Sequence, residues 1–445
     1  MAEQKQNRAH AETRRRGEKA TENGLPSPVD GWRMMPLREA YRFTSKPRGM
    51  KTEKGTTVPF LPMDQIPIGR VTVSTYEERP AESITSGTYI ENGDLLVAKI
   101  TPSFENGKQA IVNWDRPFGY ATTEVIPIQE VKGISDKRYL FHILLHPEIR
   151  SALAGKMDGT TGRQRLSKET LGSCVIPVPP LTTQREIAAI LGQVQKAIEE
   201  QERLLALTAE LKRTLLHRLF TQGLRGEPQK QTDIGPVPES WELVPLSALA
   251  KIGNGSTPKR DNQAYWQGGH IPWLNSARIH DRFINEPDQF VTDLAVKACH
   301  LPRVKANSLL IAITGQGKTL GNSALVEFET CINQHLAYAQ FTTPKVLPAF
   351  VLWYMQTRYD HLRSISQAGG STKGALTCGY LKTYPIPIPL LDEQKDIVTV
   401  FSALEVREKF CQRKHATLSD LFRTLLHQLM TGQIMETNYC PMRMR

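Results

Sequence analysis

Two long segments of the chain carry apolar residues at the spacing of an amphipathic helix. In residues 181–222, apolar or small residues recur at alternating intervals of three and four, interrupted only at Gln201 and Thr208. Residues 391–433 repeat that register, with interruptions at Arg407 and Lys414. The stripe predicts one long helix in each segment, roughly 60 Å in length, with an apolar face for a partner. The positions predicted for the helix seam or for partner contact are Gln184, Ile187, Ile190, Val194, Leu204, Leu211, Leu215, Gln394, Ile397, Val400, Leu404, Leu418, Leu421 and Leu425.

A segment of mixed pattern precedes each predicted helix, the first body at residues 31–180 and the second body at residues 239–390. Short apolar runs bounded by turn residues, "GDLLVAKI" at 93–100 and "NSLLIAIT" at 307–314, predict buried strands. The expected fold is a mixed α/β (α+β) chain of two tandem domains, each followed by a long helix. We expect the two helices to pair as an antiparallel coiled coil with pseudo-twofold symmetry; the alternative is that each helix packs only on its own body. Residues 1–30 are expected to be a disordered leader, 223–238 a linker and 434–445 a tail.

The two halves repeat one plan. "IPVPPLTTQREI" at 176–187 recurs as "IPIPLLDEQKDI" at 386–397, an offset of 210 residues. The same offset relates "GTTGRQRLS" (159–167) to "GGSTKGALT" (369–377) and "LKRTLLHRL" (211–219) to "LFRTLLHQL" (421–429). The bodies otherwise have little sequence in common. Each half therefore combines a variable body with a shared arm.

Composition adds a constraint on partners. The chain has 445 residues, 56 Lys and Arg against 45 Asp and Glu, and a formal net charge of +11. A surplus of this size favours a polyanionic partner such as nucleic acid. No run of about 18 apolar residues could span a bilayer. Six scattered cysteines without a C-x-x-C pair argue against a disulfide framework or a zinc ribbon and fit a reducing cytoplasm.

The motifs that could carry catalysis are weak in their context. "AITGQGKTL" at 312–320 ends like a phosphate-binding loop, but its first glycine is missing and the following residues predict a turn and a strand instead of a helix. His142 and His146 have the spacing of a zinc pair but no third ligand can be named. Glu-x-Lys triplets lack the acidic partner of a nuclease site, and no amino-methylation motif occurs. No catalytic residue and no metal ligand is predicted.

The repeated arms point to a family. Two variable bodies, each followed by Pro-x-Pro, Leu, x-x-Gln-x-x-Ile and a long heptad helix, resemble the specificity subunit of a type I restriction-modification system, from about Trp32 to Gln433. The resemblance implies that each body is a target recognition domain reading one half of a bipartite site in double-stranded DNA. It implies that the helices dock two methyltransferase (modification) subunits and, through the complex, restriction/translocase subunits. It implies no catalysis by this chain, no cofactor bound to it, and S-adenosylmethionine and ATP on the partner subunits.

Within that resemblance, residue types in polar and basic loops suggest the DNA contacts. Hydroxyl, amide, ammonium and guanidinium donors suit phosphates and base edges. The bland alternative is solvated surface charge, or a loop that only caps the next strand. The predicted DNA-binding residues are Lys46, Arg48, Lys51, Lys99, Lys108, Thr160, Thr161, Arg163, Gln164, Arg165, Asn254, Ser256, Lys259, Arg260, Asn262, Gln316, Lys318, Ser371, Thr372 and Lys373.

Two other classes of function stay open at this point. A stand-alone restriction-methylation enzyme or ATPase requires a catalytic motif. Each candidate motif in this chain lacks a residue or a neighbouring element that the activity needs. A coiled-coil adaptor that binds no DNA is opposed by the charge and by the two unlike bodies.

Overall fold

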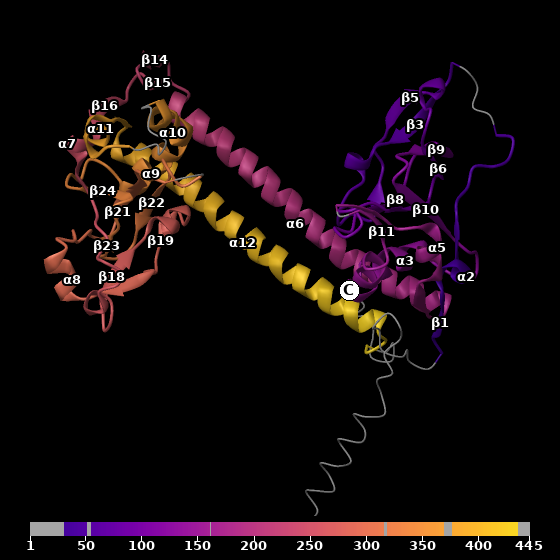
Figure 1. The fold of residues 1–445 in the computed structure, drawn as a ribbon. Coiled ribbons are helices and arrows are strands. Elements are labelled where there is room, and N and C mark those ends of the chain that lie inside the picture. Colours follow the sequence, from indigo (N-terminus) through magenta and orange to yellow (C-terminus); the bar gives the residue numbers. More distant parts are fainter. Residues whose placement is uncertain (1–30, 51–54, 161, 316–317, 369–375, 435–445) are drawn as a thin grey trace, which may run out of the picture. The chain divides into compact units, whose positions relative to one another are not determined.

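The computed structural model describes residues 31–50, 55–160, 162–315, 318–368 and 376–434. Its contacts divide the chain into two units (Figure 1). Unit 1 contains the residues up to Leu204 together with those from Cys411 onward, and unit 2 is Leu205–Phe410. The division falls within both long helices, α6 (Leu181–Gln222) and α12 (Leu391–Met430). Each unit therefore consists of one body, one end of α6 and the opposite end of α12.

The first body is built on two sheets. The five-stranded sheet has the order β2 (Tyr41–Phe43), β10 (Val125–Glu130), β7 (Leu95–Ala98), β8 (Gln109–Val112) and β4 (Thr72–Val73). The four-stranded sheet has the order β5 (Glu77–Pro80), β3 (Thr57–Leu61), β9 (Phe118–Ala121) and β6 (Thr88–Glu91). All four residues of β7 are buried, which confirms the strand predicted from "GDLLVAKI".

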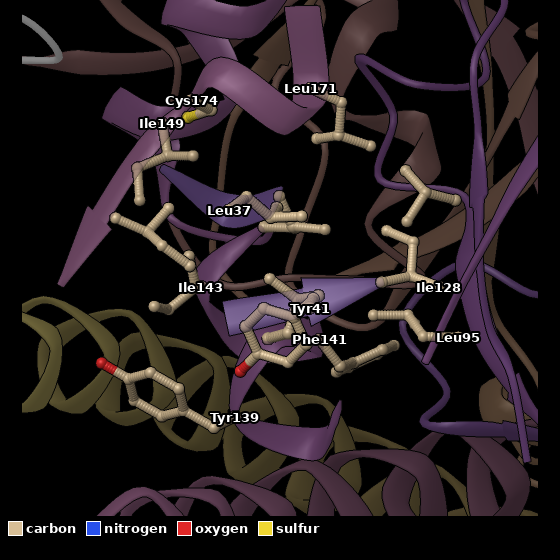
Figure 2. Close-up of a cluster of buried hydrophobic side chains, with 14 of the residues drawn as sticks. Leu37, Tyr41, Leu95, Ile128, Tyr139, Phe141, Ile143, Ile149, Leu171 and Cys174 are labelled. Atoms are coloured by element: carbon tan, nitrogen blue, oxygen red, sulfur yellow. The ribbon is translucent and has the colours of Figure 1, made fainter. Parts of the chain in front are cut away.

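Short helices complete unit 1 and close its core. They are α2 (Leu37–Ala40), α3 (Lys137–Ile143), α4 (Pro147–Ala154) and α5 (Lys168–Ser173), with single turns η1 (Met63–Gln65) and η2 (Ala81–Ser83). Figure 2 shows side chains from these helices and the sheet meeting in one apolar cluster, among them Leu37, Leu95, Phe141, Ile149 and Leu171. The same cluster includes Ile187 and Leu191 of α6 and Leu426 and Leu429 of α12, so both helices are part of the core of unit 1.

The second body repeats the five-stranded sheet of the first body and three of the four strands of its smaller sheet. Its five-stranded sheet has the order β17 (Ala250–Asn254), β24 (Leu336–Phe341), β21 (Ser308–Ala312), β22 (Ser323–Val326) and β19 (Phe283–Ile284). A three-stranded sheet has the order β20 (Gln289–Val291), β18 (Ile271–Leu274) and β23 (Cys331–Ile332). The direction of each pairing also matches: β3 and β18 each pair antiparallel with one neighbour and parallel with the other. Two bodies with little common sequence therefore share one topology.

Helices of the second body are α7 (Leu246–Leu249), α8 (Asp293–Ala298), α9 (Pro348–Thr357), α10 (Tyr359–Ala368) and α11 (Cys378–Thr383), with turns η3 (Gln263–Tyr265) and η4 (Ser276–His280). Their core includes Trp241, Phe350 and Trp353, together with Phe220 of α6 and Phe401 of α12. A hairpin of β14 (Gln229–Thr232) and β15 (Gly235–Pro238) lies between α6 and this body. Among the described residues, no helix is both long enough and apolar enough to cross a membrane.

The repeated Pro-x-Pro segments are strands that close each body. β13 (Val175–Val178) pairs antiparallel with β1 (Arg33–Pro36), and β25 (Pro385–Ile388) pairs antiparallel with β16 (Glu242–Pro245). Proline favours extended chain and cannot continue a helix, which explains why the long helices begin only after these strands, at Leu181 and Leu391.

The repeated glutamine fastens the start of each long helix to its own body. Gln184 accepts a hydrogen bond from the backbone N–H of Asp136 and donates to the carbonyls of Ile134 and Pro179. Each of the three bonds is 2.9 Å long. Gln394 makes the equivalent set, with the N–H of Leu347 at 2.8 Å and the carbonyls of Lys345 at 3.0 Å and Pro389 at 2.9 Å. Both side chains are fully buried. The prediction that Gln184 and Gln394 contact a partner or the helix seam is therefore wrong.

Candidate nucleic-acid interface

The glycine-rich loop of the first body is a hairpin. β11 (Asp158–Thr160) pairs with β12 (Arg163–Arg165), and Arg165 lies opposite Asp158. Thr160, Arg163 and Arg165 are exposed, Gln164 is half-buried, and Thr161 lies outside the described residues. The hairpin thus presents hydroxyl and guanidinium donors on two short exposed strands, which is compatible with the predicted DNA contact.

Arg165 is held by a carboxylate. Its Nη2 and Nε donate to Glu124 at 2.9 and 3.0 Å. The hydrogen bond from Arg165 holds the pKa of the Glu124 carboxyl below its usual value. The backbone of Thr101 also donates to the carbonyl of Gln164 at 3.1 Å. Arg163 has no such carboxylate in the described part of the chain, so it is the more available cation of the hairpin.

Asn106 and Gly107 lie in the connection between β7 and β8, which pair antiparallel as a hairpin. Residues 101–107 form a longer turn in which Phe104 is buried, and Asn106 and Gly107 line a pocket of about 480 Å³ beside the long helices within unit 1. Lys108 Nζ donates to the carbonyl of Met63 at 2.7 Å. This bond engages the Lys108 ammonium inside the body, so it is not free for the predicted DNA contact. Lys99 is half-buried next to Glu124.

The remaining predicted residues of the first body lie between β2 and β3. Lys46 and Arg48 are exposed, and the Lys46 ammonium lies 5.5 Å from the centre of the Tyr120 ring. Lys51 falls outside the described residues. Lys46 and Arg48 stay predictions for phosphate contact.

In the second body, some of the predicted residues around the end of β17 stabilise the fold, and others are exposed to solvent. Asn262 caps η3 by accepting from the N–H of Ala264 at 3.2 Å, and the Ser256 carbonyl accepts from Trp273 Nε1 at 3.3 Å. Asn254 and Lys259 are exposed. Arg260 is exposed, and its guanidinium lies over a tryptophan, 4.1 Å from the centre of the Trp266 ring.

Several second-body predictions fall on undescribed residues. Gln316, Ser371, Thr372 and Lys373 lie outside the described residues, and Lys318 is exposed beside them. After Lys318 the chain turns and enters β22, which confirms the strand expected there. The helix that a phosphate-binding loop requires at this point is replaced by that strand.

His142 and His146 do not share one helix. His142 is in α3, while His146 precedes α4 as its N-cap. His142 packs against Phe422 of α12, and His146 Nε2 lies 3.3 Å from His427 Nδ1. In the parts of the chain that the structure describes, no group of three or more His, Cys, Asp or Glu side chains could hold a metal ion.

Burial of His142 predicts a pH dependence of unit 1. Burial lowers the pKa of His142 to about 3, below the value of about 6.5 expected in the unfolded chain. Because the folded state resists protonation, its stability is full above the unfolded pKa and falls as the pH drops. Between pH 7 and pH 5 we expect His142 to cost about 2 kcal/mol of unfolding free energy.

Comparison with His142→Leu isolates this effect. Asp94 acts in the opposite direction, because burial raises the pKa of its carboxyl to about 6 and acidification then stabilises the folded state. Urea unfolding of wild type and His142→Leu at pH 7 and pH 5 cancels the Asp94 contribution. The expected result is an acid loss about 2 kcal/mol larger in wild type; equal losses in the two proteins would show that His142 does not titrate as described.

The long helices bury one row of residues each. On α6 and on α12 the row advances by four and then three residues, and no member is exposed. This alternation is the spacing of a coiled-coil seam. The rows are Ile187, Leu191, Val194, Ile198, Gln201, Leu205, Thr208, Lys212, Leu215 and Leu219 on α6, and Ile397, Phe401, Leu404, Glu408, Cys411, His415, Leu418, Phe422, Leu425 and Leu429 on α12.

This row corrects part of the predicted seam. Leu211 and Leu421 are 49% and 43% exposed and lie outside it, while Ile190, Leu204 and Val400 are half-buried beside it. Lys212 is buried in place of Leu211. Its ammonium donates to Glu405 at 2.7 Å and to Glu408 at 3.0 Å, all within unit 2, and it lies 5.2 Å from the centre of the Trp353 ring. Carboxylate partners explain why a charged residue is buried where a leucine is available.

Comparison with known proteins agrees with the repeat. The family model described as "Type I restriction modification DNA specificity domain" matches residues 53–209 and 238–418, once in each half. A Methanocaldococcus jannaschii protein, the putative type I restriction enzyme MjaX specificity subunit, is 24% identical over 345 residues, covering 77% of this chain and 78% of that protein. The MjaVIII specificity subunit of the same organism is 22% identical, covering 72% and 75%.

A solved structure shares the fold. The type I restriction-modification S subunit from M. genitalium superposes with a TM-score of 0.58 at 13% identity, covering 89% of this chain and 96% of that one. The two family matches together span well over half of the sequence, and the resemblance seen in the repeated arms is confirmed. The chain belongs to the family of type I restriction-modification DNA specificity subunits, with one specificity domain in each half.

Proposed function

We propose that each unit reads one half of a bipartite site in double-stranded DNA and that the helices between them bind two methyltransferase subunits. The observation that carries the proposal is the combination of one topology with two different surfaces. The two bodies share the order of their five-stranded sheets and of three strands in their smaller sheets, and the same buried glutamine fastens each to its helix, while their exposed loops differ. A protein that reads two unlike half-sites needs this combination. Its two bodies can share one backbone fold, but the side chains that contact the bases must differ between them.

The helices serve as the spacer in this proposal, paired as an antiparallel coiled coil. Support comes from each unit taken separately. In unit 1 the first turns of α6 share a core with the last turns of α12, and in unit 2 the last turns of α6 share a core with the first turns of α12. The alternating four-and-three rows of buried residues fit a coiled-coil seam. A paired helix of this kind is stiff enough to set a half-site spacing.

Exposed apolar residues on the helices support partner docking. On the unit 2 part of α12, Val406 and Phe410 are 69% and 64% exposed, and Leu207 and Leu211 are exposed on the unit 2 part of α6. Large apolar side chains in one region of a water-facing helix favour a protein partner. Leu211 and Leu421 thereby fit the partner-binding half of their prediction, since they do not fit the seam.

The chemistry is assigned to the partners. We place S-adenosylmethionine on the methyltransferase subunits and ATP on restriction/translocase subunits that join through the complex. The turn and strand that follow Gly-Lys-Thr at 317–319 support the second assignment, because they lack the helix N-terminus that cradles phosphate. This chain then contributes recognition and assembly, without a catalytic group of its own.

Genome-wide mapping of methylated bases tests the function. The map is made in the source organism with the gene intact, with the gene deleted, and with the gene restored on a plasmid. The expected result is one split motif, with two short specified halves around a fixed spacer, that disappears on deletion and returns on restoration. An unchanged map, although the methyltransferase that copurifies with the chain is active, would contradict the proposal.

A further inference from the structure

The two bodies contain an equivalent aromatic position in their smaller sheets. On β3, Phe60 lies opposite Glu77 of the antiparallel neighbour and Tyr120 of the parallel neighbour. On β18, Trp273 lies opposite Gln289 of its antiparallel neighbour and Cys331 of its parallel neighbour. The backbone bonds that follow also match, since Leu61 and Leu274 each accept from the residue just after the parallel strand. Phe60 and Trp273 therefore occupy one structural position, and so do Glu77 and Gln289.

In unit 1 a guanidinium group lies on this aromatic position. The Arg79 guanidinium is 3.8 Å from the centre of the Phe60 ring. Its Nε donates to Glu77 Oε2 at 2.9 Å, and its Nη2 donates to the same oxygen. The Arg79 side chain is still 39% exposed, so the contact with Phe60 and the hydrogen bonds to Glu77 hold the guanidinium without covering it.

In unit 2 a different part of the chain supplies the same group. Val291 stands where Arg79 would be, opposite Ile271. Arg260, from the loop before η3, instead places its guanidinium 4.9 Å from the centre of the Trp273 ring and 4.1 Å from that of Trp266. Its Nη1 donates to Gln289 Oε1. Arg79 and Arg260 are not related by the sequence repeat. Each nevertheless places its guanidinium on the equivalent aromatic residue of its own body.

We propose that Arg79 and Arg260 are specificity-determining residues, each reading a guanine in its own half-site; the inference rests on the proposed function. Guanine presents O6 and N7 in the major groove, and the fork of two guanidinium nitrogens matches that pair of acceptors. An aromatic platform and hydrogen bonding to one neighbouring side chain, Glu77 or Gln289, hold the fork, so little conformational entropy remains to be lost on binding. Glu77 and Gln289 each occupy part of the fork and leave donors on its other edge.

The surroundings of Arg260 distinguish it from three other arginines of the second body. Arg278, Arg282 and Arg303 each form an ion pair with a carboxylate. Arg260 has no carboxylate partner within the described residues and lies in a shallow hollow of about 700 Å³. Gln263, Gln267 and Phe290 also line this hollow, and none of the described residues around it is acidic. Arg260 is thus a positioned guanidinium without a neutralising carboxylate, surrounded by glutamine amides. Such a group can donate hydrogen bonds to the edge of a base.

A phosphate contact is the competing role, and base selectivity separates the two. The chain is purified in complex with its own methyltransferase subunits and used to select DNA from a library in which each position of the wild-type motif is randomised. In Arg260→Ala we expect the preference for guanine to fall about 10- to 100-fold at one position in one half-site. Arg79→Ala should do the same at one position in the other half.

Conservative and distant variants complete the test. Arg260→Lys and Arg79→Lys keep the charge but lose the planar fork, so they should lose the guanine preference as well. Arg116→Ala and Arg303→Ala remove surface arginines that pair with Glu78 and Glu329, and should leave every position unchanged. Thermal unfolding confirms that each variant is folded, and the lysine variants decide the outcome if an alanine variant is not.

Three results would overturn the inference. An unchanged motif in the arginine variants would show that neither side chain reads DNA. An equal loss of affinity for all sequences would assign them to phosphate. Retention of guanine preference in the lysine variants would show that charge alone suffices. If the wild-type complex itself selects no split motif, the proposed function fails, and that result is distinct from the other three.

Discussion

Replacing Gln184 by alanine should lower the free energy of unfolding of unit 1 by about 3 to 5 kcal/mol. The change leaves the N–H of Asp136 and the carbonyls of Ile134 and Pro179 without their side-chain partner. An unsatisfied buried group costs about 1 to 3 kcal/mol. The bond to Pro179 is buried and the other two are part-buried, and all three lie where the long helix meets the body. Gln394→Ala should have the same effect on unit 2, where Leu347, Lys345 and Pro389 lose the equivalent bonds.

The two variants are controls for each other. Urea unfolding of the full chain, followed by hydrogen exchange at residues 134–139 and 345–349, assigns each loss to a unit. Gln184→Ala should expose only the first segment and Gln394→Ala only the second. Gln193→Ala, an exposed glutamine on α6, should be within about 0.5 kcal/mol of wild type. If Gln184→Ala is no worse than Gln193→Ala, the glutamine does not fasten the helix to the body.

Replacing Lys212 by methionine should destabilise unit 2 by about 2 to 4 kcal/mol. The Lys212 side chain is only 9% exposed, and its ammonium lies between Glu405 and Glu408 beside the Trp353 ring. Burial by itself raises the pKa of Glu405, but the hydrogen bond from Lys212 and the charges of Arg282, Lys212 and Lys409 together lower it. Removing the ammonium leaves two carboxylates near one another, with Arg282 as the remaining partner of Glu405.

The Lys212 loss should also depend on pH in a defined direction. Because the folded pKa of Glu405 is lowered, its contribution is present above the unfolded value of about 4.3 and is lost as the pH falls through the folded value. The difference between wild type and Lys212→Met should therefore shrink when urea unfolding is repeated below pH 4. Arg213→Ala, at an exposed neighbouring position, serves as the control. A pH-independent difference would mean that packing on Trp353, and not charge, is what the lysine contributes.

The seam shows how far periodicity can be used. An interval of three and four residues occurs on more than one face of a long helix, so the sequence predicted both helices but assigned Leu211 and Leu421 to the buried row. Burial of Lys212 depends on Glu405, Glu408 and Trp353, which are more than 140 residues away in the chain and are on other elements. The repeat likewise drew attention to Gln184 and Gln394, yet only the folded body shows which backbone groups they bind.

Candidate DNA-contact residues divide in the same way. Residue type alone selected Lys108, whose ammonium is bonded to Met63, and Asn262, which caps a turn. It passed over Arg79, because no motif surrounds it and its counterpart in the second half is a valine. Its place on Phe60 becomes evident only from the pairing of β3 with β5.

The sequence by itself determined the elements that depend on local pattern and on repetition: the two long helices, the Pro-x-Pro strands before them, the division into two variable bodies with shared arms, and through these the family. The tertiary structure decided what depends on contacts between distant residues. It gave the larger sheets of the two bodies the same strand order despite dissimilar sequence, buried Lys212 and left Leu211 exposed, and placed Arg79 and Arg260 at equivalent positions of their own bodies. Periodicity reports the neighbours of a residue along its own helix or strand, whereas strand pairing and side-chain packing are set by elements far away in the chain.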